Sequence, residues 1–263
     1  MELGLSGKVA IVAASSKGMG KAIAMGLAAE GARVTMLART TADLERAAQE
    51  VREACHADVL AIPADVTRSE DVKRIVHDTV ARWGTVNILV NNAGGPTPGV
   101  FDEVDDAKWQ SAFELNLLST VRLVREVLPY MRKAGGGAII NLQSTSVKMP
   151  IDTLILSNSI RPGVVGLAKS LSRELARDKI RVNTVLPGII MTDRQREMLT
   201  IWSQKQGRSF DEMKRLREQE VPLGRMGDPE EVANMIVFLA SDRARYVTGI
   251  TVQVDGGLIR SVM

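Results

Sequence analysis

Short apolar runs alternate with longer amphipathic segments along almost the whole chain, and this alternation constrains the fold more than any other feature. The first cycle has an apolar run over residues 8–13, a loop of small residues, and apolar residues at helical spacing over 21–30 that end at Gly31. This order predicts a strand, a loop, a helix and a glycine stop. Strands that alternate with helices are joined by crossover connections, so they form a parallel sheet with helices on both faces.

The same cycle repeats to the end of the chain. The segment Asp228-Pro229-Glu230-Glu231 opens a further predicted helix, with Asp228 as its N-cap. Strands are expected at residues 8–13, 33–37, 59–63, 86–91, 138–142, 181–186 and 251–254, and helices also at 41–54, 69–83, 106–132 and 153–177. These seven strands predict an α/β fold in which a doubly wound parallel sheet has helices on both faces.

Composition favours one domain over residues 1–263. The chain has 263 residues, of which 45% are hydrophobic, so it can bury one substantial core, and no linker or repeat divides it. Its single cysteine, Cys55, excludes an internal disulfide and a cysteine-rich zinc site, so no metal is expected. Basic and acidic residues are interleaved at a net charge of +3, which argues against nucleic-acid binding. No apolar run has the length of a membrane span or a secretion signal, so we expect a cytoplasmic protein without a membrane partner.

The loop between the first strand and the first helix has the character of a phosphate site. It reads Ala13-Ala14-Ser15-Ser16-Lys17-Gly18-Met19-Gly20. Glycines at 18 and 20 let a pyrophosphate approach the backbone, and the following helix offers free N–H groups and the positive end of its dipole. Ala14 adds a methyl group at the tight turn, which predicts modest strain.

Four segments together resemble the short-chain dehydrogenase/reductase family in its classical form, and within it the 3-oxoacyl-(acyl carrier protein) reductases. They are this first loop, the run Asn91-Asn92-Ala93-Gly94, the segment 137–170 around Ser144, and the run Pro187-Gly188-Ile189-Ile190-Met191-Thr192. The resemblance covers nearly the whole chain. It implies a Rossmann-type fold, a nicotinamide dinucleotide cofactor, and hydride transfer between a carbonyl compound and an alcohol.

The resemblance also implies which residues hold the cofactor. They lie in the first loop and after the third, fourth and sixth strands: Ala14, Ser16, Lys17, Gly18, Met19, Gly20, Asp65, Val66, Asn92, Ala93, Gly94, Pro187, Gly188, Ile190 and Thr192. Arg39 stands where an NAD-preferring protein would carry an acidic residue. Arg39 and Lys17 can instead pair with a 2′-phosphate, so NADP(H) is predicted in preference to NAD(H).

The catalytic segment departs from the pattern that it resembles. In the family a serine is followed by Tyr-x-x-x-Lys, whereas here Ser144 is followed by Ser157-Asn158-Ser159-Ile160-Arg161. Ser144 and Asn116 match the serine that binds the carbonyl and the asparagine that holds a relay water. Ser157 stands at the place of the tyrosine acid, and Arg161 keeps a cation for the nicotinamide ribose. We therefore predict all four as catalytic positions, with Arg161 also a cofactor contact.

Serine is a much weaker acid than tyrosine. A phenol titrates near pH 10, and an aliphatic hydroxyl is a weaker acid by roughly five pKa units, which corresponds to about 7 kcal/mol of free energy between the two protonation states. Arginine does not release a proton, and Pro162 removes a backbone N–H from the same predicted helix. The alternative to a catalytic role is that Ser157 and Arg161 occupy ordinary positions on a helix.

Other proton carriers are expected to lie elsewhere. In the family fold the positions of Tyr130, Tyr246, His56 and His77 are away from the cleft. Ser146, Lys148 and Ser159 are expected nearer to it. Asp152 is predicted to be the N-cap of the helix over 153–177.

Two functions remain open on this basis. The first is an NADP(H)-dependent oxidoreductase with a non-standard proton donor, acting on a small-molecule carbonyl or alcohol. The second is an NADP(H)-binding protein without turnover, serving as a redox sensor or as the partner subunit of an active relative. In both cases the resemblance implies a substrate lid at about 193–225. It also implies a homo-oligomer, a tetramer or a dimer, built on the helices at 106–132 and 153–177.

Overall fold

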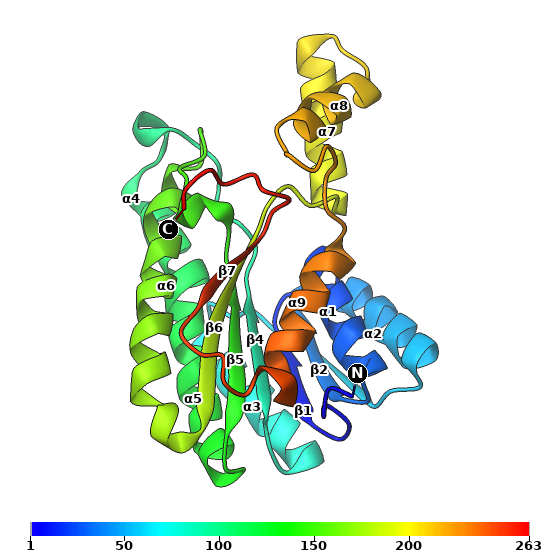
Figure 1. Ribbon diagram of the computed structural model, residues 1–263, viewed down its shortest axis with the longest axis vertical. Helices are drawn as coiled ribbons and strands as arrows, with labels where there is room; N and C mark the ends of the chain where they lie inside the picture. The colour runs from blue at the N-terminus through cyan, green and yellow to red at the C-terminus, as the bar shows by residue number, and fades with distance from the viewer. Residues whose placement is uncertain (1, 263) are drawn as a thin grey trace.

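The computed structural model describes residues 2–262 and contains one parallel seven-stranded sheet (Figure 1). The strand order is β3-β2-β1-β4-β5-β6-β7, so the direction of winding reverses between β1 and β4. The strands are β1 (Val9–Val12), β2 (Arg33–Ala38), β3 (Val59–Pro63), β4 (Ile88–Asn92), β5 (Gly137–Leu142), β6 (Ile180–Pro187) and β7 (Thr251–Val254). The predicted doubly wound α/β fold is confirmed.

Helices cover both faces of the sheet (Figure 1). One layer holds α1 (Gly18–Ala29), α2 (Thr41–Cys55) and α9 (Pro229–Ala240), and the other holds α3 (Ser69–Trp83), α5 (Ser119–Lys133) and α6 (Ile155–Glu174). Side chains of β1 enter the two layers alternately: Ala10 and Val12 join the first core, and Ile11 joins the second. All four residues of β1 are buried, as a strand covered on both faces requires.

Two helix starts and one long helix differ from the prediction. α1 begins at Gly18, three residues earlier than expected, so the glycines of the first loop belong to its first turn. The stretch predicted as one helix is divided into α4 (Asp106–Phe113), a π-helical turn (Glu114–Leu118) and α5. The N-cap prediction for Asp152 is wrong, because Thr153 takes a left-handed φ of 64° and α6 starts only at Ile155.

Two further helices, α7 (Asp193–Gln206) and α8 (Phe210–Gln219), project from the end of the sheet where the strands finish (Figure 1). They share a small apolar cluster that is separate from the two main cores and contains Ile189, Leu199, Met213, Val221 and Met226. A cluster of this size stabilises the pair only modestly, so we expect α7 and α8 to open more readily than the helices that cover the sheet. Among the described residues, no helix is long and apolar enough to cross a membrane.

The loop between β1 and α1 leaves no room for a side chain at Gly20. A Cβ atom there would lie 2.1 Å from the Ala14 carbonyl oxygen and 2.8 Å from Asn92 Nδ2. Ala14 itself has a φ of 48°, in the left-handed region that costs energy for any residue with a Cβ, so the predicted strain is present. Gly20 is therefore required for closing the loop.

Replacing Gly20 by alanine should lower the free energy of unfolding by about 1–3 kcal/mol, since the methyl group would force the loop apart. Gly166→Ala is the matched control, because a Cβ at this exposed position of α6 meets no atom within 4 Å. That substitution should leave stability unchanged or raise it by up to about 1 kcal/mol. Urea denaturation of both variants measures the difference, and equal stabilities would contradict this role of Gly20.

Candidate active site at the carboxyl ends of the strands

The amino end of α1 is open to an anion. Lys17 occupies the N-cap position but provides no side-chain cap, and the first turn carries no acidic residue. The buried Ser15 hydroxyl fixes the loop from beneath, since it donates to the Val12 carbonyl and accepts from the Leu37 amide at 3.0 Å. The uncapped N–H groups of α1 therefore face the cleft with their positive dipole end. Ser16 and Met19 are half-buried beside them.

The first loop lies against the segment after β6. A Cβ atom on Gly18 would lie 3.3 Å from Thr192 Cγ2, so the two predicted cofactor segments are neighbours. The Thr192 hydroxyl also caps α7 by accepting from the Gln195 amide at 3.3 Å. Pro187 ends β6, and Gly188 passes so close to Asp255 that a Cβ would come within 2.7 Å of its Cα. The structure thus brings Gly18 and Thr192 together.

The end of β4 is tied to both of its neighbours. Asn92 donates from Nδ2 to the carbonyls of Ala13 and Ala14 at 3.1 and 3.3 Å, which holds the first loop against β4. Asn91 donates to Asn141 on β5 at 2.8 Å. Half-buried Ala93 and exposed Gly94 follow, at the mouth of the cleft. Asn92 therefore holds the backbone of the first loop in place by hydrogen bonds. The sequence did not predict this structural role.

The loop after β3 is organised by Asp65. Its carboxylate accepts from the backbone and hydroxyl of Thr67 at 2.9 and 2.8 Å, and its own amide donates to Asp71. The contact with Asp65 lowers the pKa of the Asp71 carboxyl. Half-buried Val66 lies in this loop. On the other side of the cleft, Ile190 pairs with Gly227 as an isolated bridge that anchors the segment after β6.

The two predicted 2′-phosphate ligands have different surroundings. Arg39 is exposed after β2. Lys17 forms an ion pair with Asp43 at 2.7 Å, and this hydrogen bond holds the pKa of the Asp43 carboxyl below its usual value. Asp43 also pairs with Arg46. Lys17 is therefore paired with a carboxylate of α2. The sequence pattern did not predict this ion pair.

Ser157 and Arg161 both point into the protein from α6. Ser157 is 4% exposed and Arg161 is 6% exposed. The Arg161 guanidinium donates from Nε to Ser157 Oγ at 3.1 Å, from Nη1 to Gln143 Oε1 at 3.2 Å, and from Nη2 to the Gly94 carbonyl at 3.4 Å. Arg161 therefore joins the ends of β4 and β5 to α6, which ordinary surface positions on a helix would not do.

A row of hydroxyl groups continues from Ser157. Its Oγ lies 3.0 Å from the Oγ of the buried Ser146, and the Ser146 amide donates to Ser144 Oγ at 3.1 Å. Because Nε of Arg161 already donates to Ser157, the proton of the Ser157 hydroxyl is free to point toward Ser146 or toward a ligand. Ser144, Ser146, Ser157 and Arg161 therefore form one connected polar cluster.

Asn116 lies in the π-helical turn between α4 and α5, a local widening that often accompanies functional sites. Its Nδ2 donates to the Gly94 carbonyl at 2.9 Å, so Gly94 accepts from both Asn116 and Arg161. The Oδ1 atom of Asn116 is buried and has no partner among the described residues. A buried acceptor without a partner costs free energy, which indicates that a ligand or a water belongs there.

The charge of Arg161 has no counter-ion. None of the ion pairs formed by residues 2–262 includes Arg161, and its three acceptors are neutral. Burial, together with the positive charge of Arg194, lowers the pKa of Arg161 to about 10. Arg194 is exposed on the first turn of α7, and its Nη1 would lie 3.4 Å from a Cβ on Gly95. Two guanidinium groups thus flank the Gly94-Gly95 backbone.

The other residues considered from sequence are dispersed. Ser159 is exposed on the outer side of α6, whereas Lys148 is half-buried and donates to Gln253 on β7 at 3.4 Å. Tyr130 packs against the core beneath α5. His56 is exposed at the end of α2, and His77 is exposed and contacts Asp78. None of the histidines and tyrosines among the described residues reaches the Ser144 cluster.

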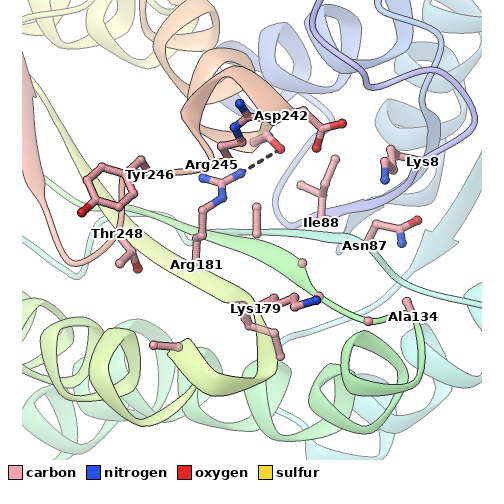
Figure 2. A pocket seen from close by; sticks show the side chains of 17 residues that line it. Lys8, Asn87, Ile88, Ala134, Lys179, Arg181, Asp242, Arg245, Tyr246 and Thr248 are labelled. Carbon is pink, nitrogen blue, oxygen red and sulfur yellow. Dashed lines mark hydrogen bonds between the residues drawn. The ribbon is translucent and has the colours of Figure 1, made fainter.

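Tyr246 lines a different cavity, of about 910 Å³, at the opposite end of the sheet (Figure 2). Lys8, Asn87, Lys179 and Arg181 also line it, and Tyr246 lies beside Thr248. The guanidinium of Arg181 is used structurally, because it donates to the carbonyls of Leu239, Ala240 and Ser241 at the end of α9. This cavity contains none of the predicted catalytic residues.

Comparison with known proteins agrees with this geometry. The sequence profile of a family described as enoyl-(acyl carrier protein) reductase matches residues 13–259. Dehydrogenase/reductase SDR family member 4 of Caenorhabditis elegans is 35% identical over 254 residues, which cover 96% of this chain and 95% of the relative. The chain belongs to the short-chain dehydrogenase/reductase family.

Other members of the short-chain dehydrogenase/reductase family match with similar completeness. A 3-oxoacyl-(acyl carrier protein) reductase of Staphylococcus epidermidis is 34% identical over 251 residues, covering 95% of this chain and 98% of the relative. The structure of L-sorbose reductase from Gluconobacter frateurii, solved with NADPH and L-sorbose, superposes with a TM-score of 0.97 at 36% identity over the full length of both chains. The seven-stranded fold of this chain is therefore that of the short-chain dehydrogenase/reductase structures it resembles.

Three residues of the site were not predicted. Gln143 binds Arg161 from the end of β5, Ser15 fixes the first loop, and Arg194 reaches the cleft from α7. Gln143 directly precedes Ser144, so its position could have been inferred. Arg194 could not, because the direction of α7 depends on packing among side chains distant in sequence.

Replacing Arg161 by methionine should raise the free energy of unfolding by about 1 kcal/mol or more, because it removes a buried charge that lacks a counter-ion. Two of its three acceptors keep another partner, since Ser157 still contacts Ser146 and Gly94 still accepts from Asn116. The control is Arg181→Met, which should destabilise the protein by about 1–3 kcal/mol, because three carbonyls lose their donor. Thermal and urea unfolding of both variants test this contrast. A marked loss of stability in Arg161→Met would contradict the view that its charge is uncompensated.

Proposed function

We propose that this chain is an NADP(H)-dependent oxidoreductase that interconverts a carbonyl compound and an alcohol. The observation that carries the proposal is that Asn116 and Arg161 of the Ser144 cluster both bind the Gly94 carbonyl, two residues after Asn92, which holds the loop before the uncapped α1. Membership of the short-chain dehydrogenase/reductase family and the NADPH held by L-sorbose reductase support it. When bound, the cofactor supplies or accepts the hydride.

The cleft fits a nicotinamide dinucleotide in three respects. The amino end of α1 suits the pyrophosphate, since its N–H groups are uncapped and no carboxylate stands in its first turn. Gly18 lies next to Thr192 and lacks a side chain, so the backbone of the first loop stays accessible there. The unpaired Oδ1 of Asn116 marks the inner end. Arg39 and Lys17 would hold the 2′-phosphate, and Asp65, Val66 and Asn92 would border the adenosine.

The hydroxyl groups of the site are suited to bind the oxygen of a carbonyl. Ser144 accepts from the Ser146 amide and keeps its own proton for donation to a substrate. We infer that Ser157 and Arg161 take the places of the family's tyrosine and lysine. In this arrangement Arg161 withdraws electron density from Ser157 through its Nε–H, and the Ser157 proton is offered to the oxygen while Ser146 follows in the relay.

A second candidate function rests on the missing phenol. The two tyrosines of the chain are Tyr130, which packs from α5 against the core, and Tyr246, at the opposite end of the sheet. A site without an acid of the right strength suits a protein that binds NADP(H) without turnover, as a redox sensor or as the partner subunit of an active relative. Tight NADPH binding together with no NADPH oxidation by any of a broad panel of carbonyl compounds would favour it.

The surroundings of the site suggest how access and assembly work. We infer that residues 193–225, which include α7 and α8, act as a substrate lid, because they stand over the cleft on a small apolar cluster of their own. The capping of α7 by Thr192 would couple this lid to the nicotinamide end. A homodimer or homotetramer through α5 and α6 remains our expectation for the assembly, with size-exclusion chromatography and light scattering as its test.

Arg39→Ala should weaken NADPH binding by about tenfold or more and leave NADH binding nearly unchanged, because only NADPH carries the 2′-phosphate. Asp43→Asn should strengthen NADPH binding, since it releases Lys17 from its ion pair. Titrations of nicotinamide fluorescence provide both dissociation constants. Equal weakening for the two cofactors in Arg39→Ala would contradict the predicted preference for NADP(H).

Ser144→Ala should lower kcat/KM for carbonyl reduction by about 100-fold, because the donor to the developing oxyanion is lost. Ser159→Ala, on the exposed side of α6, is the control and should have no effect. The double variant Ser157→Tyr, Arg161→Lys should raise kcat by about 100-fold or more by restoring a stronger acid. NADPH oxidation followed by absorbance measures all three. Turnover that survives unchanged in Ser144→Ala would overturn the assigned mechanism.

A further inference from the structure

The positive charge of Arg161 has no counter-ion among the described residues, and this bears on which substrate the site can bind. Guanidinium has five N–H donors, and Arg161 gives three of them to Ser157, Gln143 and Gly94. Two donors, one on each terminal nitrogen, are left without a described acceptor. With 6% of Arg161 exposed, bulk water cannot fully compensate either the donors or the charge.

A second cation faces the same backbone. Arg194 extends from the first turn of α7 to Gly95, where its two terminal nitrogens would lie 3.4 and 3.6 Å from a Cβ. Its neighbour Asp193 is exposed, and no described ion pair includes Arg194. Two like charges that approach each other repel unless an anion lies between them.

Open space lies beside Gly94, the residue whose carbonyl Arg161 binds and whose neighbour Gly95 faces Arg194. A Cβ atom built on Gly94 would meet nothing within 4 Å, although the Gly94 carbonyl is held by Arg161 and Asn116. The nearest hydroxyls are those of Ser144, Ser146 and Ser157, all neutral donors. The predicted place of the cofactor phosphates is at the amino end of α1, beside Gly18, whereas Arg161 belongs to the cluster formed by α6 and the ends of β4 and β5. The nicotinamide ribose predicted beside Arg161 is neutral, so it could accept a hydrogen bond from the guanidinium but would leave the charge without a counter-ion.

We propose that the carbonyl substrate carries a carboxylate close to its reacting carbon, and that Arg161 and Arg194 hold this carboxylate between them. The planar fork of guanidinium matches a carboxylate with two hydrogen bonds. The carbonyl oxygen then lies toward Ser144 and Ser157. In reduction the hydride adds to the carbonyl carbon and a proton adds to its oxygen, while the carboxylate remains intact and negatively charged.

Arg194 would also couple substrate binding to closure of the proposed lid. It stands on α7, so binding of an anionic substrate would draw the first turn of this helix toward the buried Arg161. A neutral ketone would offer neither cation a partner and would leave their mutual repulsion in place. This specificity rests on the proposed oxidoreductase function, but binding of the carboxylate does not require turnover.

The test is a calorimetric titration of the protein saturated with NADP⁺, with oxamate as the probe and neutral oxamide as its matched analogue. Oxamate should bind at least about tenfold more tightly than oxamide. Arg194→Gln should weaken oxamate binding about tenfold and leave the affinity for NADP⁺ unchanged. Arg196→Gln removes the same charge from the same helix at another exposed position and should change neither.

Equal binding of oxamate and oxamide would overturn the proposal. So would an Arg194→Gln variant that loses NADP⁺ affinity but keeps oxamate affinity, because Arg194 would then serve the cofactor phosphates. Failure of the proposed oxidoreductase function would give a different result. Oxamate would then bind as expected, but neither 2-oxo acids nor neutral ketones would oxidise NADPH. Reduction of neutral ketones as efficient as that of 2-oxo acids would reject the carboxylate and retain the oxidoreductase.

Discussion

A buried guanidinium without a counter-ion is the constraint on which the arrangement of the site depends. Arg161 is 6% exposed, and only neutral oxygen atoms of Ser157, Gln143 and Gly94 accept its hydrogen bonds. Folding alone gains little from a charge in such a place, since desolvation opposes it. Burial and the nearby charge of Arg194 both lower the pKa of Arg161, that is, they oppose its positive charge. A bound anion would supply the counter-charge that the folded chain lacks.

The parallel sheet makes this arrangement possible. All strands finish at the same edge, so β4 and β5 deliver Gly94 and Gln143 side by side, and α6 returns Arg161 across them. The π-helical turn before α5 directs Asn116 to the same Gly94 carbonyl. Asn92 connects this region to the first loop, where α1 begins. One backbone carbonyl and one amide side chain thus link the two halves of the site.

Much of the fold followed from sequence because its signals are local and repeated. The ranges of β3, α3 and β7 were predicted to the residue, since each has a clear periodicity and a distinct stop. Asp152 was wrong as an N-cap because the backbone at Thr153 turns left-handed before α6. The helical stretch predicted over 106–132 is present, but the π-helical turn within it was not predicted, because such a turn has no simple sequence pattern. The position of Arg194 and the pairing of Lys17 with Asp43 depend on contacts between distant segments, which periodicity does not encode.

The most direct test of the account is to follow the hydride itself. The protein would be incubated with NADPH deuterated at the transferable position of the nicotinamide and with a 2-oxo acid, and the hydroxy acid product would be analysed by mass spectrometry. The account predicts one deuterium on the carbon that bears the new hydroxyl group. Consumption of the 2-oxo acid without deuterium in the product, or no product from any carbonyl compound despite bound cofactor, would contradict it.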